Sequence, residues 1–307
     1  MNLDLGGRTA LVTGSSQGIG AAIAAGPARA GATVGVNGRD AGRLAKSVEK
    51  LRAEVPDGVF VPVAADLGTA EGAERALEAL PDVDVLVNNL GVFGAAPALE
   101  IGDDEWRRYF EINVLAGVRP TRAHLPRMRD RGWGRVLYIA SDSAVVIPAE
   151  MIHYGVSKTA LLGVGRGFAK EAAGSGVTVN CVIAGPTHTE GVEDFVYQLV
   201  DRDLPWDEAQ RVFMREHRPQ SLLQRLIEPE EIANLVVYLS SPLASATTGA
   251  AVRVDGGYVD SILPWAPRLI RARRARPRPR AAGPPRSRPG CRAAPRTVPP
   301  RTGIRRR

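Results

Sequence analysis

Three residues that could bind a substrate oxygen and move a proton lie near one another in the sequence, at Ser141, Tyr154 and Lys158. Tyr154 and Lys158 are four residues apart, so in a helix they lie on one face and the ammonium can sit beside the phenol. A free phenol titrates near about 10, and a nearby cation favours the phenolate, so we expect Lys158 to lower the pKa of Tyr154. Such a tyrosine could transfer protons near neutral pH.

The surrounding sequence favours a catalytic role for this pair over a surface role. A Tyr-x-x-x-Lys pair alone is weak evidence, because such pairs are common on solvent-exposed helices. Here the apolar run at residues 136–140 predicts a buried strand that ends at Ser141, and a loop containing Pro148 leads on to Tyr154. The end of this strand would hold the serine hydroxyl in place.

A glycine-rich segment near the N-terminus predicts a phosphate-binding turn. Residues 8–13 form a short strand-like run, followed by Gly14, Gly18 and Gly20 and an alanine-rich helical segment. Gly14 would permit the tight turn, Gly18 would let the backbone approach a pyrophosphate, and Gly20 would allow the helix to pack closely on the strand. Helix N-terminal amides would face the phosphates, so we also assign cofactor contacts to the intervening residues Ser16, Gln17 and Ile19.

Together these motifs resemble the short-chain dehydrogenase/reductase family, and within it members such as the 3-oxoacyl-(acyl carrier protein) reductases. In that family a serine precedes the Tyr-x-x-x-Lys motif by thirteen residues, as Ser141 precedes Tyr154, and the glycine spacing is the same. The resemblance covers roughly residues 5 to 260. It implies reversible hydride transfer between a nicotinamide and a small-molecule carbonyl or secondary alcohol.

The resemblance also implies a role for each catalytic residue. Ser141 would bind the substrate oxygen, Tyr154 would give or take its proton, and Lys158 would hold the ribose hydroxyls of the cofactor while lowering the pKa of the tyrosine. Asn113, in a predicted long helix, would bind a water molecule and extend a proton relay from the lysine.

Further cofactor contacts are implied at the ends of the later predicted strands. Asp66 would face the adenine, although a capping role for the following helix stays open. Gly185 would meet the nicotinamide carboxamide, and Thr189 would lie near the phosphates. Besides the residues of the glycine-rich segment, the resemblance implies cofactor contacts at Asp66, Leu67, Asn88, Asn89, Gly91, Tyr154, Lys158, Gly185, Thr187 and Thr189.

The residues after the second predicted strand favour NADP over NAD. NAD-preferring members that resemble this chain carry an aspartate where Gly38 stands, and the following Arg39 suits a 2′-phosphate. NAD stays possible as the cofactor. Asp40 is expected to cap the next helix.

Three positions depart from the family pattern. Pro27 follows Gly26 about two turns into the first helix, so we expect a kink near residues 23–27. Leu90 replaces a small residue in the Asn-Asn-Ala-Gly pattern, and Ala184 replaces the proline that normally precedes Gly185. We expect these changes to alter packing and loop stiffness without removing a reactive group.

Strand-like runs alternate with helical patterns along most of the chain, which predicts an α/β fold. We expect one doubly wound, Rossmann-type domain over residues 1–264, with about seven mostly parallel strands and helices on both faces. Residues 190–224 match the family's mobile substrate lid, and residues 248–257 match its last strand and terminal Asp-Gly-Gly.

The charge of the chain is unevenly distributed. The 307 residues have a net charge of +7, but fifteen arginines and no acidic residue lie in residues 265–307. Without that segment, 25 basic and 33 acidic residues remain, a net charge of −8. We expect this arginine- and proline-rich tail to be disordered. Two alternative functions stay open: nonspecific nucleic-acid binding through the tail, and a non-catalytic dinucleotide-sensing regulator on the same fold.

The remaining features bear on location, assembly and metals. The chain has no run of about 18 apolar residues and no signal-peptide pattern at residues 1–5, and Cys181 and Cys291 make no disulfide framework. We therefore expect a cytoplasmic protein without a membrane span, and the family resemblance implies a homodimer or homotetramer. None of the four histidines has a second ligand at metal-binding spacing, so we expect no metal.

Overall fold

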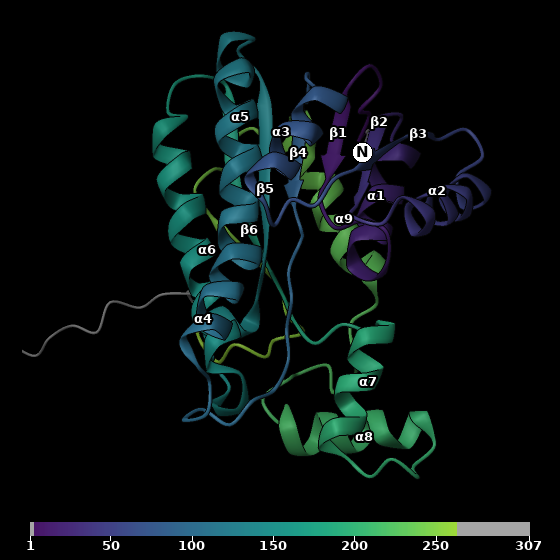
Figure 1. The fold of residues 1–307 in the computed structure, drawn as a ribbon, viewed down its shortest axis with the longest axis vertical. Helices are drawn as coiled ribbons and strands as arrows, with labels where there is room; N and C mark the ends of the chain where they lie inside the picture. The colour runs from purple at the N-terminus through teal and green to yellow at the C-terminus, as the bar shows by residue number, and fades with distance from the viewer. Residues whose placement is uncertain (1–2, 263–307) are drawn as a thin grey trace, which may run out of the picture. The chain divides into compact units, whose positions relative to one another are not determined.

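The computed structural model describes residues 3–262, which are built around one seven-stranded sheet (Figure 1). The strands are β1 (Thr9–Val12), β2 (Thr33–Gly38), β3 (Val59–Ala64), β4 (Val85–Asn88), β5 (Gly134–Ser141), β6 (Val177–Ala184) and β7 (Ala251–Val254). Their order is β3-β2-β1-β4-β5-β6-β7, and all six pairings between them are parallel. The predicted doubly wound α/β fold is confirmed.

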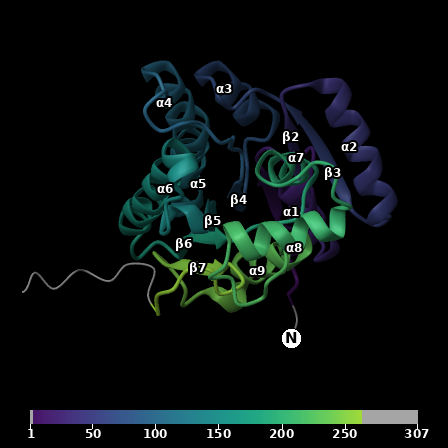
Figure 2. The same ribbon diagram turned by 90° about the horizontal axis from the view of Figure 1, so that it is seen from below.

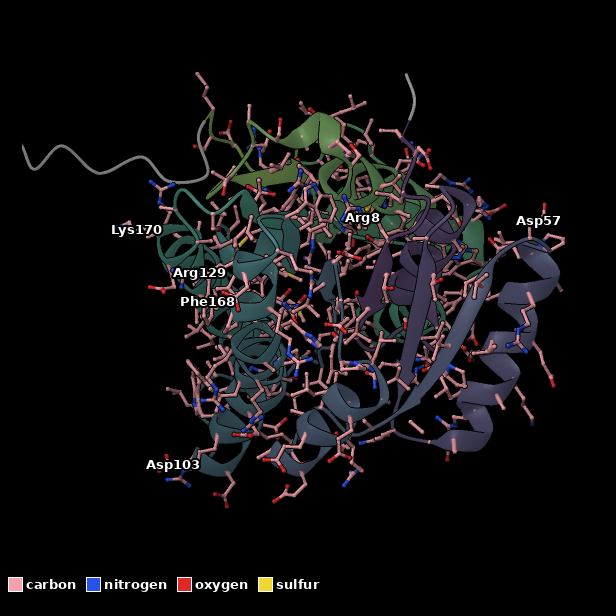
Figure 3. All side chains as sticks on the ribbon, turned by 90° about the horizontal axis from the view of Figure 1, so that it is seen from above. Arg8, Asp57, Asp103, Arg129, Phe168 and Lys170 are labelled. Carbon is pink, nitrogen blue, oxygen red and sulfur yellow. The ribbon has the colours of Figure 1, made fainter. Side chains whose placement is uncertain are left out.

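Helices cover both faces of the sheet, as parallel strands require. The α-helices are α1 (Gly18–Arg29), α2 (Ala41–Glu54), α3 (Ala70–Ala79), α4 (Asp103–Phe110), α5 (Ala116–Asp130), α6 (Ile152–Glu171), α7 (Glu190–Leu199), α8 (Trp206–His217) and α9 (Pro229–Ser240). One core contains buried residues of α1, α2 and α9, and a second contains those of α3, α5 and α6. Charged residues such as Asp57, Asp103 and Lys170 lie at the outer edges of these layers (Figure 3).

The strand order creates the crevice in which the site forms. The chain runs outward from β1 to β3 and then returns to the centre to form β4 beside β1. At such a reversal, the connections that leave the two neighbouring strands diverge to opposite faces and leave an opening at the carboxyl ends. The register places Ser141 opposite Ala184, so the loops after β5 and β6 begin side by side at the same edge.

The first helix, α1, runs through Pro27 to Arg29 without a break, and the kink expected near residues 23–27 stays a prediction. Pro27 lies in the last turn, so its missing N–H removes one intrahelical hydrogen bond close to where the helix ends. The preceding glycine has a packing reason: a Cβ at Gly26 would lie 2.7 Å from Cγ2 of Val237 on α9. Close contact between α1 and α9 therefore explains why position 26 is a glycine.

The predicted long helix around Asn113 consists of three segments. Between α4 and α5, residues Glu111–Leu115 form a turn of π-helix. Single turns of π-helix occur mostly inside α-helices, and they are frequent at functional sites. Asn113 lies in this turn and is buried.

Two helix caps were considered from the sequence. The side chain of Asp40 accepts a hydrogen bond from the Arg43 amide and caps α2, as predicted. Asp66 does not cap α3, because Thr69 occupies the N-cap and accepts from the Gly72 amide. Asp66 Oδ1 instead accepts from the Gly68 amide within its own loop.

The segment that resembles the substrate lid contains α7 and α8, which lie beyond one end of the sheet (Figures 1 and 2). It has a small apolar core of its own, in which Phe195, Phe213 and Met214 pack with Met151 from the α6 side. The mobility of this segment stays a prediction. The Arg-rich segment 265–307 and its expected disorder lie outside the described residues. Within residues 3–262, no helix is both long and apolar enough to span a bilayer.

Candidate active site

A cavity of about 750 Å³ opens at the carboxyl ends of the strands. Its wall is formed by the loops that follow β1, β2, β3, β4, β5 and β6, together with residues of α6 and the α7–α8 segment. Most of the residues singled out from the sequence therefore meet in one place. At this size the cavity suits a cofactor with a small substrate.

The glycine-rich loop forms the part of the wall nearest α1. Gly14 and Gly18 have positive φ values of 60° and 56°, which glycine adopts without strain. A Cβ at Gly20 would lie 2.3 Å from the Gly14 carbonyl oxygen, so Gly20 is needed for packing. A Cβ at Gly18 would meet only Thr189, at 3.4 Å, and so would project into the cavity.

This loop has the features needed to hold a phosphate. The N-cap of α1 is Gln17, whose side chain makes no capping hydrogen bond, and the first turn contains no acidic residue. The first amides of α1 therefore lack the intrahelical partners and the side-chain cap that would satisfy them. An anion at this end would be stabilised by those amides and by the helix dipole, so the residues fit the dinucleotide that the sequence implies.

A network of polar side chains fixes this loop, and the sequence analysis did not identify it. Asn37 at the end of β2 accepts from the Gly14 amide at 3.1 Å and donates to the carbonyls of Val63 and Ala65. The side chain of Asn89 donates to the carbonyls of Thr13 and Gly14, both at 3.0 Å. Hydrogen bonds therefore connect the ends of β2, β3 and β4 to the turn that follows β1.

At the other end of the cavity the wall includes Ser141, Tyr154 and Lys158. Ser141 ends β5, and its hydroxyl donates to Asp142 Oδ1 at 2.8 Å. Tyr154 lies near the start of α6, and Lys158 follows one turn later with its Nζ 5.7 Å from the centre of the tyrosine ring. Lys158 is buried, and its ammonium donates to the Ile139 carbonyl at 2.9 Å.

The prediction that Lys158 lowers the pKa of Tyr154 is not what the structure gives. Burial raises the pKa of the Tyr154 phenol above its usual value, and the nearby charge of Asp142 raises it further. The neighbouring Ser141 side chain and the charge of Arg218 act in the opposite direction. Burial also lowers the pKa of Lys158 to about 8. Desolvation is the largest cause of the shift in the pKa of Tyr154, and the four-residue spacing to Lys158 did not reveal it.

Asn113 reaches this end of the site from the π-helical turn, although it does not form part of the cavity wall. Its side-chain amide donates to the Val92 carbonyl and to Ser157 Oγ, and its oxygen accepts from the Val92 amide. A Cβ at Gly91 would lie 3.3 Å from both Asn113 Oδ1 and Lys158 Nζ, so the two groups flank that glycine. Binding of a relay water by Asn113 stays a prediction.

One predicted cofactor residue points elsewhere. The side chain of Asn88 donates to Thr121 Oγ1 on α5 at 3.1 Å, and Asn88 is absent from the cavity wall. Tyr138 donates to the same threonine hydroxyl at 2.6 Å. The side chain of Asn88 therefore links the sheet to α5 and does not line the cavity, and a cofactor contact for Asn88 stays a prediction. Asn89 and Gly91, which follow it, do line the cavity.

The remaining predicted cofactor residues lie on the wall. Arg39, Asp66 and Leu67 line the part formed by the loops after β2 and β3, and Arg39 is exposed there. Gly185 packs so closely that a Cβ would lie 2.7 Å from the Cα of Asp255. Of the two threonines that follow it on the wall, Thr187 donates to the Gly185 carbonyl and Thr189 caps α7.

Two charged wall residues near Tyr154 were not predicted from the sequence. Asp142 is buried, and its Oδ2 has no hydrogen-bond partner within the described part of the chain. Arg218 follows α8 and is buried as well. Neither residue belongs to a sequence motif, and the tertiary packing of the chain brings both to the cavity wall. Within residues 3–262, no cluster of three or more His, Cys, Asp or Glu side chains is arranged to hold a metal ion.

Comparisons with known proteins agree with this geometry. A family model described as enoyl-(acyl carrier protein) reductase matches residues 14–259. The oxidoreductase YvaG of Bacillus subtilis is 49% identical over 263 residues, which cover 85% of this chain and all of the relative.

Two solved structures are also similar. The L-sorbose reductase of Gluconobacter frateurii, complexed with NADPH and L-sorbose, is 33% identical with a TM-score of 0.80. A putative NAD(P)-dependent gluconate 5-dehydrogenase of Beutenbergia cavernae with bound NADP is 35% identical with a TM-score of 0.73. In both cases 85% of this chain matches the whole of the other.

The chain belongs to the short-chain dehydrogenase/reductase family. It is an NAD(P)-dependent oxidoreductase that transfers a hydride between a nicotinamide and a carbonyl or secondary alcohol.

Proposed function

We propose that this chain is an NADP(H)-dependent carbonyl reductase or alcohol dehydrogenase in which Ser141, Tyr154 and Lys158 are the catalytic residues and Asn113 supports them. The observation that carries the proposal is that a serine hydroxyl, a phenol and an ammonium line one end of a cavity whose other end has an uncapped, glycine-rich helix start. A non-catalytic regulator would not need this acid–base set.

The bound dinucleotide supplies or accepts the hydride at its nicotinamide ring. Tyr154 holds the proton at its phenol oxygen and delivers it to the substrate oxygen during reduction. Because burial raises the pKa of Tyr154, the phenol is protonated at neutral pH, which is the form that reduction requires.

Ser141 positions the substrate oxygen beside this phenol. Its hydroxyl donates to Asp142 Oδ1 here, and it would turn that hydrogen bond toward the carbonyl oxygen of the substrate. Lys158 would hold the ribose hydroxyls of the dinucleotide, because its ammonium lies on the same wall and is fixed by the Ile139 carbonyl. Asn113 would fix the loop at Val92 and the α6 residue Ser157 next to Lys158 through its hydrogen bonds to both.

Three features support NADP(H) over NAD(H). Position 38 has no acidic side chain to repel a 2′-phosphate, and Arg39 and Arg43 both line this part of the cavity. The similar L-sorbose reductase structure contains NADPH. An arginine fork suits a phosphate group better than a ribose hydroxyl.

Replacement of Tyr154 by phenylalanine tests the mechanism. The variant removes one oxygen, so it should bind NADPH as the wild type does while kcat/KM for ketone reduction falls about 10²- to 10⁴-fold. Tyr238→Phe on α9 is the matched control, because Tyr238 does not line the cavity, and its rate should stay within about twofold of wild type. Dinucleotide binding is followed by calorimetry and turnover by NADPH absorbance. A Tyr154→Phe enzyme as fast as the wild type contradicts the mechanism.

We also propose that residues 1–264 form the catalytic domain and that the protein acts in the cytoplasm as a homodimer or homotetramer. Phe110 and Leu115, on α4 and the π-helical turn, are 38% and 39% exposed, and burial of such apolar side chains favours association. The free, buried Cys181 is compatible with a reducing compartment. Light scattering on the full chain tests the assembly, and a monomeric mass contradicts it.

A further inference from the structure

Arg218 is a buried cation on the cavity wall that the proposed chemistry does not use. It follows α8 directly, and its side chain is only 8% exposed. Burial raises the pKa values of both Asp142 and Tyr154, and the charge of Arg218 acts against that rise, which places the guanidinium at the catalytic end of the cavity. Arginine is seldom buried without a partner for its charge.

The guanidinium is held in place, but its hydrogen-bonding capacity is not used up. Nη1 donates to the His217 carbonyl at 2.6 Å. The rings of Phe213 and Tyr258 lie 5.1 and 5.9 Å from the guanidinium carbon, within the range of cation–π attraction. Among residues 3–262, Nε and Nη2 find no hydrogen-bond partner. A guanidinium that is fixed on a cavity wall and keeps N–H groups without a partner among residues 3–262 is prepared for a ligand.

The carboxylates around Arg218 do not neutralise it well. Glu150 Oε1 lies 3.6 Å from Nη1, which is too long for a hydrogen bond, and the Glu150 side chain is 34% exposed. Asp142 makes no ion pair with Arg218. Burial also raises the pKa of Asp142, which favours its uncharged form. A counter-ion role toward Glu150 alone would not require Arg218 to lie on the wall of the cavity.

Building on the proposed function, we propose that Arg218 binds an oxyanion of the substrate, so that this enzyme prefers ketones and alcohols that also carry a carboxylate or phosphate group. The planar guanidinium binds either group through two parallel hydrogen bonds. Phe93, Phe195 and Phe213 line the same end of the cavity and would contact the carbon chain between the oxyanion and the carbonyl. Arg218 is thus a specificity residue, distinct from the groups that transfer hydride and proton.

Matched substrate pairs test this preference. The reductions of 2-oxobutanoate, 3-oxobutanoate and 4-oxopentanoate are compared with those of their methyl esters, and dihydroxyacetone phosphate is compared with dihydroxyacetone. The three acids vary the spacing between carbonyl and carboxylate, and the last pair distinguishes phosphate from carboxylate. We expect the full-length wild-type enzyme to favour at least one anion over its neutral partner by about 30-fold or more in kcat/KM.

Variants of Arg218 identify the residue responsible. Arg218→Gln should lose about 30-fold or more in kcat/KM for the preferred anion, mainly through KM, with a much smaller loss of kcat/KM for the neutral partner. Arg218→Lys keeps the positive charge but loses the planar, two-pronged donor geometry, so its kcat/KM for the preferred anion should lie between those of wild type and Arg218→Gln. Arg215→Gln is the control, because Arg215 lies in the last turn of the same helix, is 67% exposed and pairs with Glu216. Arg215→Gln should leave kcat/KM unchanged for both members of each substrate pair.

The outcomes separate this inference from the proposed function. Equal rates on anions and esters, or equal losses for both in Arg218→Gln, overturn the role of Arg218 while leaving the reductase intact. Calorimetric titration of 4-oxopentanoate onto the NADP-loaded chain gives a readout that does not depend on turnover. Binding that is lost in Arg218→Gln, in a protein that reduces no ketone, would refute the proposed function and support the oxyanion site.

Discussion

Replacement of Lys158 by methionine should stabilise the protein in the absence of dinucleotide and abolish its activity. Lys158 is 5% exposed, and its ammonium has one hydrogen bond, to the Ile139 carbonyl, with no ion pair to a carboxylate in the described part of the chain. Burial lowers its pKa from 10.5 to about 8. The folded protein therefore keeps an incompletely compensated positive charge at neutral pH.

The size of this penalty follows from the pKa difference. A lowering from 10.5 to about 8 corresponds to roughly 3 kcal/mol of unfolding free energy. Below pH 8 the lysine is charged in both states and the full penalty is present. Between about pH 8 and 10.5 the unfolded chain keeps the proton that the folded chain releases, so wild-type stability rises with pH and the penalty disappears. Methionine loses the bond to Ile139, which offsets about 1 kcal/mol and leaves a net gain of about 2 kcal/mol at pH 7.

Denaturant unfolding of the full-length chain from pH 6 to 10, without added dinucleotide, measures this difference. Lys170→Met is the matched control, because Lys170 lies exposed in the last turn of the same helix, and it should change stability by less than about 0.5 kcal/mol at every pH. Ketone reduction by Lys158→Met should fall about 10²-fold or more. A Lys158→Met protein that is less stable than wild type at pH 7, or whose advantage does not shrink above pH 8, refutes the reasoning.

Two further substitutions test the cofactor end of the cavity. Gly18→Ala should raise KM for NADPH about tenfold or more and lower stability by about 1 kcal/mol, because the backbone at Gly18 has φ 56° and the added Cβ would project into the cavity. The control is Gly102→Ala, where an added Cβ meets nothing within 4 Å. Steady-state kinetics that show equal KM values for Gly18→Ala and wild type would contradict the assignment. Arg39→Ala should reduce kcat/KM with NADPH about tenfold to a hundredfold, while kcat/KM with NADH should change less than about twofold. The control is Arg29→Ala, an exposed ion-pair partner of Glu54, which should change neither value. An equal loss with both dinucleotides would exclude Arg39 as the ligand of the 2′-phosphate.

Local patterns in the sequence were sufficient for the parts of the site in which one segment provides both position and chemistry. Gly14, Gly18 and Gly20 take the conformations and close contacts that their spacing indicated. Ser141 and Lys158 reach the same wall because a strand end and a helix face fix where their side chains point. Strand and helix periodicity likewise predicted the doubly wound sheet.

Other parts depend on the environment of a side chain, which spacing does not reveal. The pKa of Tyr154 is raised chiefly by burial, and burial is a property of the assembled fold. The π-helical turn around Asn113 differs from an α-helix in its hydrogen bonds, and no residue type marks it. Asn88 resembled a cofactor ligand by motif, yet its side chain turns to Thr121 on a helix more than thirty residues away in sequence. Arg218 lies in the variable lid segment and comes near Tyr154 through tertiary packing alone.

The described chain places several of its buried ionisable groups against the same cavity, and this arrangement has a physical consequence. Asp142, Lys158 and Arg218 are each at most 6% exposed, and each has an incomplete set of partners in the absence of ligand. Such groups destabilise a cofactor-free protein, because the free-energy cost of removing them from water is not offset by a complete set of hydrogen bonds and ion pairs. A dinucleotide whose ribose meets Lys158 and a substrate whose oxyanion meets Arg218 would complete those pairings. Ligand binding should therefore raise the stability of this enzyme most strongly when both ligands are bound together.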